Sequence, residues 1–176
     1  VDPSGTPKEI LATLIAESND HYVKGGLLET AQALNLSPYE VLIVGSLVQK
    51  ESKPADFAKV ARVIYNRLDQ GMPLQLDSTV SYALGITDIQ LNEEQLGTSS
   101  PYNTYQNKGL PPRPINSPGE AALEAALNPA KGDWLYFVTV DPRTGETKFA
   151  KDYDRFLVYQ KEFQATLAEI EAEQNE

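Results

Sequence analysis

Apolar side chains recur at helical spacing along most of this chain. Residues three and four positions apart predict one helix that stops at Gly26 and a shorter one over residues 27–34. A third helix begins behind Ser37 and ends at Glu51, because Pro54 follows so closely that the helix cannot continue. Glu51 is therefore predicted to lie at a helix C-terminus.

Three predicted helix starts share one pattern: a capping hydroxyl, Pro at the first helical position and Glu at the third. The pattern occurs at Thr6-Pro7-Lys8-Glu9, Ser37-Pro38-Tyr39-Glu40 and Ser117-Pro118-Gly119-Glu120. The hydroxyl and the carboxylate each accept a hydrogen bond from a backbone N–H group that has no partner within the helix. We therefore place helix starts behind Thr6, Ser37 and Ser117.

The middle of the chain combines two helices with a long loop. Residues 57–68 keep the helical spacing and Gly71 fits the C-cap position. Asp77 fits the N-cap of a short helix that ends at Gly85. Residues 97–118 are dense in Gly, Pro, Asn, Ser, Thr and Tyr, and a long ordered loop of this composition usually carries function.

The last part of the chain predicts a hairpin between two helices. After a helix over residues 121–127, residues 134–140 predict a buried strand, 141–145 a turn and 146–149 a returning strand. A closing helix carries its apolar face on Phe156, Tyr159, Phe163, Leu167 and Ile170. Its acidic tail, residues 169–176, is expected to fray. The predicted fold is α+β: a mainly helical single domain over residues 1–176, with a small β-hairpin and a long Pro/Asn/Tyr-rich active-site loop.

Composition narrows the function. The 176 residues, 41% of them hydrophobic, can bury one core. A net charge of −10 without a basic stripe argues against a nucleic-acid partner. The sequence has no apolar run long enough to cross a bilayer, and Val1 opens into a polar stretch rather than a signal sequence. We expect that the chain begins inside a longer protein.

The residue inventory limits the available chemistry. The absence of cysteine excludes thiol nucleophiles, disulfides and thiolate metal sites. A Ser-His-Asp triad would depend on the single histidine, His21, which we interpret as a surface helical residue, and a multi-histidine metal site is excluded. We therefore expect no cofactor and no metal. Catalysis would depend on carboxylates, hydroxyls, amides or lysines.

Several short stretches, taken in order, resemble the YceG-like (MltG-type) endolytic murein transglycosylases. They are Val48-Gln49-Lys50-Glu51, Val63-Ile64-Tyr65-Asn66-Arg67-Leu68, Gly71-Met72-Pro73-Leu74-Gln75-Leu76-Asp77-Ser78-Thr79-Val80, Ser100-Pro101-Tyr102-Asn103-Thr104-Tyr105, Gly109-Leu110-Pro111-Pro112, Pro114-Ile115, Ser117-Pro118-Gly119, Ala126-Leu127-Asn128-Pro129-Ala130 and Leu135-Tyr136-Phe137-Val138. The similarity covers about residues 37–153. It departs from the family pattern at Gln49, where the family has an acid, at Ser78, and at Arg113 and Asn116-Ser117.

The resemblance implies that Glu51 is the catalytic glutamate of a peptidoglycan lytic transglycosylase. Such an enzyme cleaves the MurNAc-β-1,4-GlcNAc bond within nascent strands without water and leaves 1,6-anhydro-MurNAc ends. One carboxyl group suffices, because the C6 hydroxyl of the substrate is the nucleophile and is already tethered near C1. Glu51 would first donate its proton to the glycosidic oxygen and then accept the hydroxyl proton. A helix C-terminus disfavours ionisation and so keeps such an acid protonated.

Around Glu51 we predict substrate contacts for seven side chains. They are Asn66, Gln75, Asp77, Tyr102, Asn103, Thr104 and Tyr105. Amides suit neutral sugars, and tyrosine rings stack on pyranose faces. Each also has a structural alternative: the tyrosines can simply pack, Asp77 can cap its helix, and Arg67 can pair with Asp77.

The resemblance also implies a cellular setting. It indicates an N-terminal transmembrane anchor and a small LysM-like domain ahead of this chain, with membrane contact only through that anchor. The site of action would be the extracytoplasmic face of the bacterial cell membrane. The partners would be peptidoglycan glycan strands and peptidoglycan synthases.

Two alternatives stay open. A non-catalytic peptidoglycan-binding module would use the same Tyr, Asn and Gln types without cleaving the strand. A conventional muramidase would need a second acid beside Glu51, for which Asp56 and Asp77 are the nearest candidates. Release of anhydro-muropeptides from sacculi separates the enzyme from the binding module.

Overall fold

The computed structural model describes residues 2–87 and 91–174, which form two compact units, Val1–Val41 and Leu42–Glu176. In the first unit, α1 (Pro7–Lys24) contacts α2 (Leu27–Ala33). The predicted capping box is present at α1, where Thr6 N–H donates to Glu9 Oε2 at 2.8 Å. Gly26 joins the two helices with φ +70°, a conformation that favours glycine. His21 is exposed on α1, as predicted.

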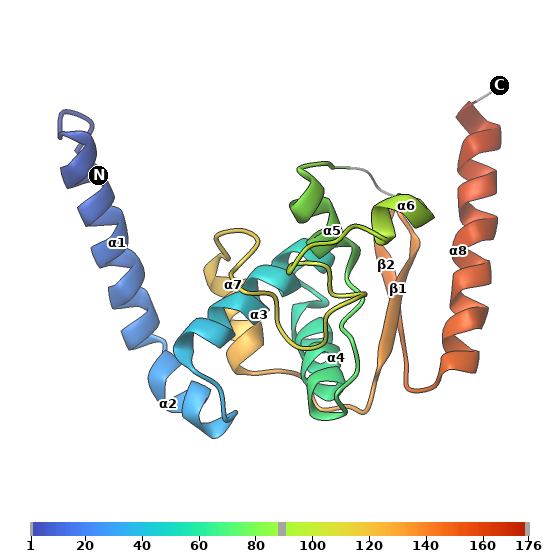
Figure 1. Cartoon of the computed structure of the whole chain (residues 1–176), viewed down its shortest axis with the longest axis horizontal. Helices are drawn as coiled ribbons and strands as arrows, with labels where there is room; N and C mark the ends of the chain where they lie inside the picture. Colours follow the sequence, from blue (N-terminus) through green and yellow to red (C-terminus); the bar gives the residue numbers. More distant parts are fainter. Residues whose placement is uncertain (1, 88–90, 175–176) are drawn as a thin grey trace. The chain divides into compact units, whose positions relative to one another are not determined.

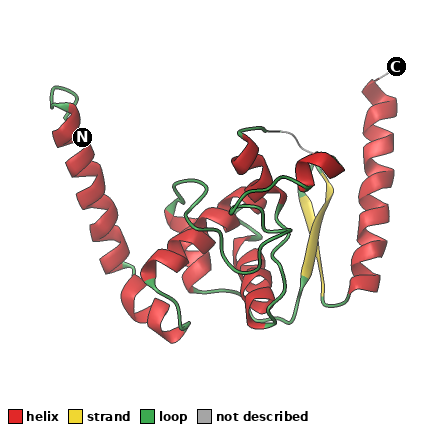
Figure 2. Cartoon of the chain, in the orientation of Figure 1, coloured by secondary structure: helices red, strands yellow, loops and turns green. Residues whose placement is uncertain are grey.

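The second unit carries the remaining elements, which Figure 1 labels and Figure 2 colours by type. They are the part of α3 (Pro38–Glu51) from Leu42 on, α4 (Phe57–Asp69), α5 (Asp77–Leu84), α6 (Glu93–Leu96), α7 (Glu120–Leu127), β1 (Tyr136–Asp141), β2 (Glu146–Ala150) and α8 (Tyr153–Gln174). Helices dominate and the strands form one small antiparallel sheet, so the predicted α+β class is confirmed.

The core of this unit lies where α3, α4, α5 and α7 meet. Its fully buried side chains include Leu47 of α3, Ile64 of α4 and Val80 of α5. Tyr65 of α4 donates its hydroxyl to the carbonyl of Ala126 in α7 at 2.7 Å, which ties those two helices together. Burying a side chain of leucine size contributes roughly 1.5–3 kcal/mol, so this cluster is the main source of stability for the unit.

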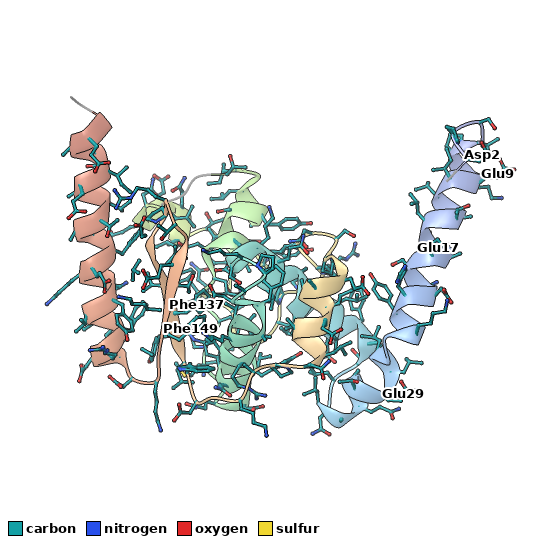
Figure 3. The ribbon with its side chains drawn as sticks, turned by 180° about the vertical axis from the view of Figure 1, so that it is seen from behind. Asp2, Glu9, Glu17, Glu29, Phe137 and Phe149 are labelled. Carbon is teal, nitrogen blue, oxygen red and sulfur yellow. The ribbon has the colours of Figure 1, made fainter. Side chains whose placement is uncertain are left out.

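The β-hairpin lies between α4 and α8 (Figure 1), and α8 makes its most extensive contacts with β1. Phe137 pairs with Phe149 across the two strands, and Figure 3 labels both side chains. Their ring centroids are 6.0 Å apart. An irregularity at Val140 shifts the register, and that side chain is buried. The strand runs over 136–141 rather than the predicted 134–140.

Two further predicted boundaries are wrong. Helix α7 starts behind Gly119 rather than Ser117, because Gly119 donates its N–H to Gln49 Oε1 at 2.6 Å and so replaces the expected hydroxyl cap with a contact from α3. The acidic tail does not fray from residue 169, since α8 continues to Gln174 and Glu173 pairs with Arg143 at 3.5 Å. Residues 175–176 of that tail, like Val1, lie outside the described residues.

Helix α6 was not predicted, although its signal is in the sequence. Asn92 and Gln95 form a capping box in which Gln95 N–H donates to Asn92 Oδ1 at 2.9 Å and Asn92 N–H donates to Gln95 Oε1 at 2.8 Å. Among the described residues, each helix is too short or too polar to cross a bilayer.

Candidate active site

A cleft of about 1320 Å³ opens on the second unit and contains Glu51. One side is formed by the end of α3, by Arg67 of α4 and by residues 74–78 leading into α5; the other side is formed by β1 and α8. Small-molecule sites usually measure about 300–1,000 Å³, so this cleft has room for a segment of a polymer.

Glu51 is the last residue of α3, as the sequence predicts, and is half-buried in the cleft. The Ser78 hydroxyl donates a hydrogen bond to Glu51 Oε1. Burial raises the pKa of Glu51 to about 7; the Ser78 hydrogen bond opposes this rise and the negative charge of Asp77 adds to it. The carboxyl group is therefore about half protonated near neutral pH, as a group that both gives and takes a proton requires.

Asp77 and Tyr105 form a second polar pair in the cleft. The Tyr105 hydroxyl donates to Asp77 Oδ1, and burial together with this hydrogen bond raises the pKa of Tyr105. Asp77 is exposed and is the first residue of α5, whereas Leu76 occupies the N-cap position. The predicted N-cap role of Asp77 is therefore wrong: its carboxylate is engaged by the phenol rather than by the backbone of its helix.

Arg67 organises its side of the cleft through hydrogen bonds to main-chain oxygens. Its guanidinium donates to the carbonyls of Leu135 at 2.6 Å, Leu74 at 2.7 Å and Pro73 at 3.2 Å, and to Gln75 Oε1 at 3.3 Å. Both Arg67 and Asp77 are described, and they form no ion pair, so that alternative is wrong. Arg67 instead holds α4, the segment before α5 and the start of the hairpin in one arrangement.

The segment ahead of α5 is also fixed to the long loop. Gln75 N–H donates to the Thr104 carbonyl at 3.0 Å, and Leu76 N–H donates to Thr104 Oγ1 at 3.0 Å. Gln75 itself adopts φ +51°, an uncommon conformation for a residue with a side chain. The two contacts hold Gln75 in this conformation, at the edge of the cleft.

The hairpin turn is fastened to the loop that follows Glu51. Lys53 Nζ donates to the carbonyl of Thr144 in the turn. The neighbouring Gly145 has φ +66°, and a Cβ at this position would lie 2.6 Å from Lys53 Cε. The positive φ favours glycine, and a larger residue would also displace the Lys53 side chain, which joins the hairpin turn to the loop after Glu51.

Of the predicted site residues, the structure brings four together in the cleft: Glu51, Gln75, Asp77 and Tyr105. The other four do not line it. Asn103 is fully buried and donates to the carbonyls of Leu96 and Thr98 at 2.9 and 2.8 Å, so its amide holds the loop together.

Thr104, Asn66 and Tyr102 likewise have internal partners. Thr104 Oγ1 lies 2.9 Å from Thr79 Oγ1, and Asn66 donates to the carbonyl of Trp134 at 2.9 Å. Tyr102 packs against Tyr82 with ring centroids 4.9 Å apart. Substrate contact by these three and by Asn103 stays a prediction without geometric support.

Other side chains in the cleft were not predicted as site residues. They include Lys50 and Ser78 beside Glu51, and Tyr136, Tyr153, Phe156, Gln160 and Gln164 on the opposite side. From the sequence, Ser78 is only a departure from the family pattern, and the apolar face of α8 gives no signal of ligand binding, because helical spacing does not distinguish a core from a cleft. Within the described residues, no group of three or more His, Asp or Glu side chains is placed to hold a metal.

Comparison with known proteins identifies the family. The YceG-like family model matches residues 1–162. An endolytic murein transglycosylase of Bacillus subtilis (strain 168) is 40% identical over 151 residues, covering 85% of this chain and 41% of that protein. One from Streptococcus pneumoniae serotype 2 (strain D39 / NCTC 7466) is 38% identical over 156 residues, covering 84% of this chain and 27% of that protein.

A solved structure supports the same assignment. The crystal structure of a YceG-like protein from Listeria monocytogenes aligns with a TM-score of 0.79 at 35% identity, over 87% of this chain and 50% of that chain. The present chain spans only about two fifths of the Bacillus relative and about a quarter of the Streptococcus relative. The match to most of its residues, at this level of identity, shows that the chain belongs to the YceG-like family.

Proposed function

We propose that this chain carries the catalytic part of an endolytic peptidoglycan lytic transglycosylase, with Glu51 as both acid and base. The observation that carries the proposal is a carboxyl group with a pKa of about 7, at the end of a helix and inside a cleft large enough for a polymer. The names of the two curated relatives, endolytic murein transglycosylase, support it.

The proposed reaction needs only one proton, which Glu51 first donates and then recovers. Protonated Glu51 donates it to the glycosidic oxygen while the bond between C1 of N-acetylmuramic acid and that oxygen breaks. The oxygen of the C6 hydroxyl on the same sugar forms a new bond to C1. The Glu51 carboxylate accepts the hydroxyl proton and returns to its starting state. No water is consumed, and the product ends in a 1,6-anhydro ring.

Hydrolysis is the second candidate, because Asp77 lies on the same cleft and its charge acts on Glu51. A hydrolase would use Asp77 to activate water or to attack C1. Asp56, the other acid considered from the sequence, occupies the N-cap position of α4 and does not line the cleft. Any two-carboxylate mechanism therefore depends on Asp77.

We predict that digestion of sacculi releases strands that end in 1,6-anhydro-N-acetylmuramic acid, formed within strands as well as at their ends. Mass spectrometry of the soluble products decides the matter. Ends heavier by one water, with a reducing sugar, would replace transglycosylation with hydrolysis. Protein that co-sediments with sacculi but releases no product would instead favour the binding module.

We also propose that the whole protein acts at the extracytoplasmic face of the bacterial cell membrane, beside peptidoglycan synthases. The family resemblance implies an N-terminal anchor and a LysM-like domain, and the curated relatives extend well beyond the matched span. An anchored cleft would meet new strands where they emerge.

Tethering can change apparent affinity by about 10²–10⁴-fold without any new contact. We therefore expect the full-length protein to cleave lipid-linked nascent strands in membranes far more efficiently than this chain does. Both forms should be assayed on the same vesicles and on detached soluble strands, where the difference should vanish. Equal activity on the vesicles would contradict this part of the proposal.

A further inference from the structure

Three aromatic rings line the cleft on the side opposite the helix end that carries Glu51. We call Tyr136 of β1 with Tyr153 and Phe156 of α8 the aromatic wall. Tyr136 and Phe156 stack with centroids 5.3 Å apart at 28°, and Tyr153 lies 5.7 Å from Tyr136 and 5.8 Å from Phe156. Tyr153 is tilted by 54° to Tyr136 and by 33° to Phe156, so the rings form one mutually supporting cluster rather than three separate contacts.

The aromatic wall is more accessible than a packing surface would be. Tyr153 is 55% exposed, and Tyr136 and Phe156 are only half-buried. Accessible apolar surface of this kind, concentrated in a cleft, usually marks a binding site. The rings are held in place all the same, because the Arg67 guanidinium lies 5.1 Å from the centroid of Tyr136 and is itself fixed by main-chain carbonyls.

Two amides continue the same face of α8. Gln160 and Gln164 lie four and eight residues after Phe156, both are exposed, and both line the cleft. Within the described part of the chain neither side chain has a hydrogen-bond partner, so their donors and acceptors are available to a ligand. The face combines flat apolar rings with neutral amides.

The charges of the cleft lie elsewhere. Glu51, Asp77 and Lys50 come from the side of α3 and α5, and the donors of Arg67 bind carbonyls. The charged neighbours on α8, Asp154 and Arg155, do not line the cleft. This surface therefore suits a ligand that is flat, apolar on one face and rich in neutral hydroxyl and acetamido groups at its rim.

We infer that the aromatic wall, with Gln160 and Gln164, is a sugar-binding subsite that positions N-acetylated pyranose rings of the strand across from Glu51. The rings stack on the apolar C–H face of the sugar, and the two amides bind hydroxyl or acetamido groups at its rim. The inference rests on the proposed function, since it takes the strand in this cleft as the substrate, but sugar binding can be measured without any cleavage.

The test is the binding of a β-1,4-linked N-acetylglucosamine tetramer to the chain carrying Glu51→Gln, measured by calorimetry. Tyr153→Ala and Phe156→Ala in that background should each weaken binding by about 3- to 10-fold, the range expected for loss of one ring contact. Gln160→Ala, on an exposed polar position that leaves folding undisturbed, should also weaken it measurably. Val158→Ala is the matched control, because this half-exposed apolar side chain of α8 lies outside the cleft.

In the active protein the same wall substitutions should raise KM for glycan strands with little change in kcat. Unchanged tetramer binding in both wall variants and in Gln160→Ala would overturn the inference while leaving the proposed function intact. An equal loss in Val158→Ala would also overturn it, because the effect would then reflect disruption of α8. Wall-dependent binding without any cleavage by the unmutated chain would have the opposite meaning: the subsite would stand and the transglycosylase proposal would fail.

Discussion

Glu51→Gln is expected to lower kcat/KM on peptidoglycan by about 10²–10⁴-fold, the usual contribution of general acid–base catalysis. The amide retains the shape of the side chain and accepts the hydrogen bond from the Ser78 hydroxyl, so the fold should be preserved. It can neither donate a proton to the glycosidic oxygen nor accept one from the C6 hydroxyl. Release of soluble muropeptides, followed over time by chromatography, measures the loss.

The matched control is Glu120→Gln, which makes the same chemical change at an exposed acid of α7 outside the cleft. It should retain full activity. Circular dichroism establishes that both variants are folded. A Glu51→Gln protein that turns over substrate near the unmutated rate would remove Glu51 from the catalytic role.

The same substitution should stabilise the second unit at alkaline pH. Burial raises the pKa of Glu51 from its ordinary value of 4.5 to about 7, so the folded chain holds this proton more tightly than the unfolded chain does. The resulting stabilisation is complete below about pH 4.5 and is lost as the pH rises through about 7. A pKa difference of this size corresponds to roughly 3 kcal/mol. The glutamine side chain of the variant is neutral at every pH, so the variant loses no stability from this cause as the pH rises.

The difference in unfolding free energy between Glu51→Gln and the unmutated chain should therefore grow in favour of the variant by about 2–3 kcal/mol between pH 4 and pH 8. Urea unfolding followed by the fluorescence of Trp134, the single tryptophan, reports the second unit selectively. Glu120→Gln should show no such growth. A constant difference between the two pH values would show that the carboxyl group is not held in its neutral form by burial.

The most accurate predictions were those that depend on neighbouring residues alone, such as the two ends of the helix that carries Glu51. Pro54 ended a helix at Glu51, and the Ser37–Glu40 capping box began it, with Ser37 N–H donating to Glu40 Oε2 at 2.7 Å. These signals act within a few residues, so no tertiary contact was needed to interpret them. The position of the proposed catalytic acid at a helix end followed directly.

Contacts distant in sequence account for most of the errors. Helix α7 starts behind Gly119 rather than Ser117, because the Gly119 N–H donates to the side-chain amide oxygen of Gln49, 70 residues earlier in the chain. Asn103, whose amide suits neutral sugars, and the adjacent Thr104 were predicted to bind substrate, yet both are buried. Whether a polar side chain meets a ligand or a backbone carbonyl depends on the folded loop, which composition does not specify.

The β1–α8 side of the cleft was missed for a different reason. An apolar helix face predicts that the face is covered, but periodicity does not show whether the protein core or a bound ligand covers it. Phe156 belonged to the predicted apolar face, and in the structure it is half-buried beside the exposed Tyr153. This face reaches the cleft because α8 packs on the hairpin and β1 of the hairpin packs on α4. Those contacts join parts of the chain that are distant in sequence.

The way Arg67 is bonded has a consequence for which substitutions the family can tolerate here. Three of its four partners are carbonyl oxygens, those of Pro73, Leu74 and Leu135, and every amino acid supplies that group. The side chains at those three positions can therefore vary, within the limits of packing, while the contacts persist. The guanidinium itself has no substitute, because lysine offers a single ammonium group where a planar fork reaches several oxygens at once. Relatives that keep this arginine could therefore differ at the surrounding positions and still hold the backbone beside the cleft in the same arrangement.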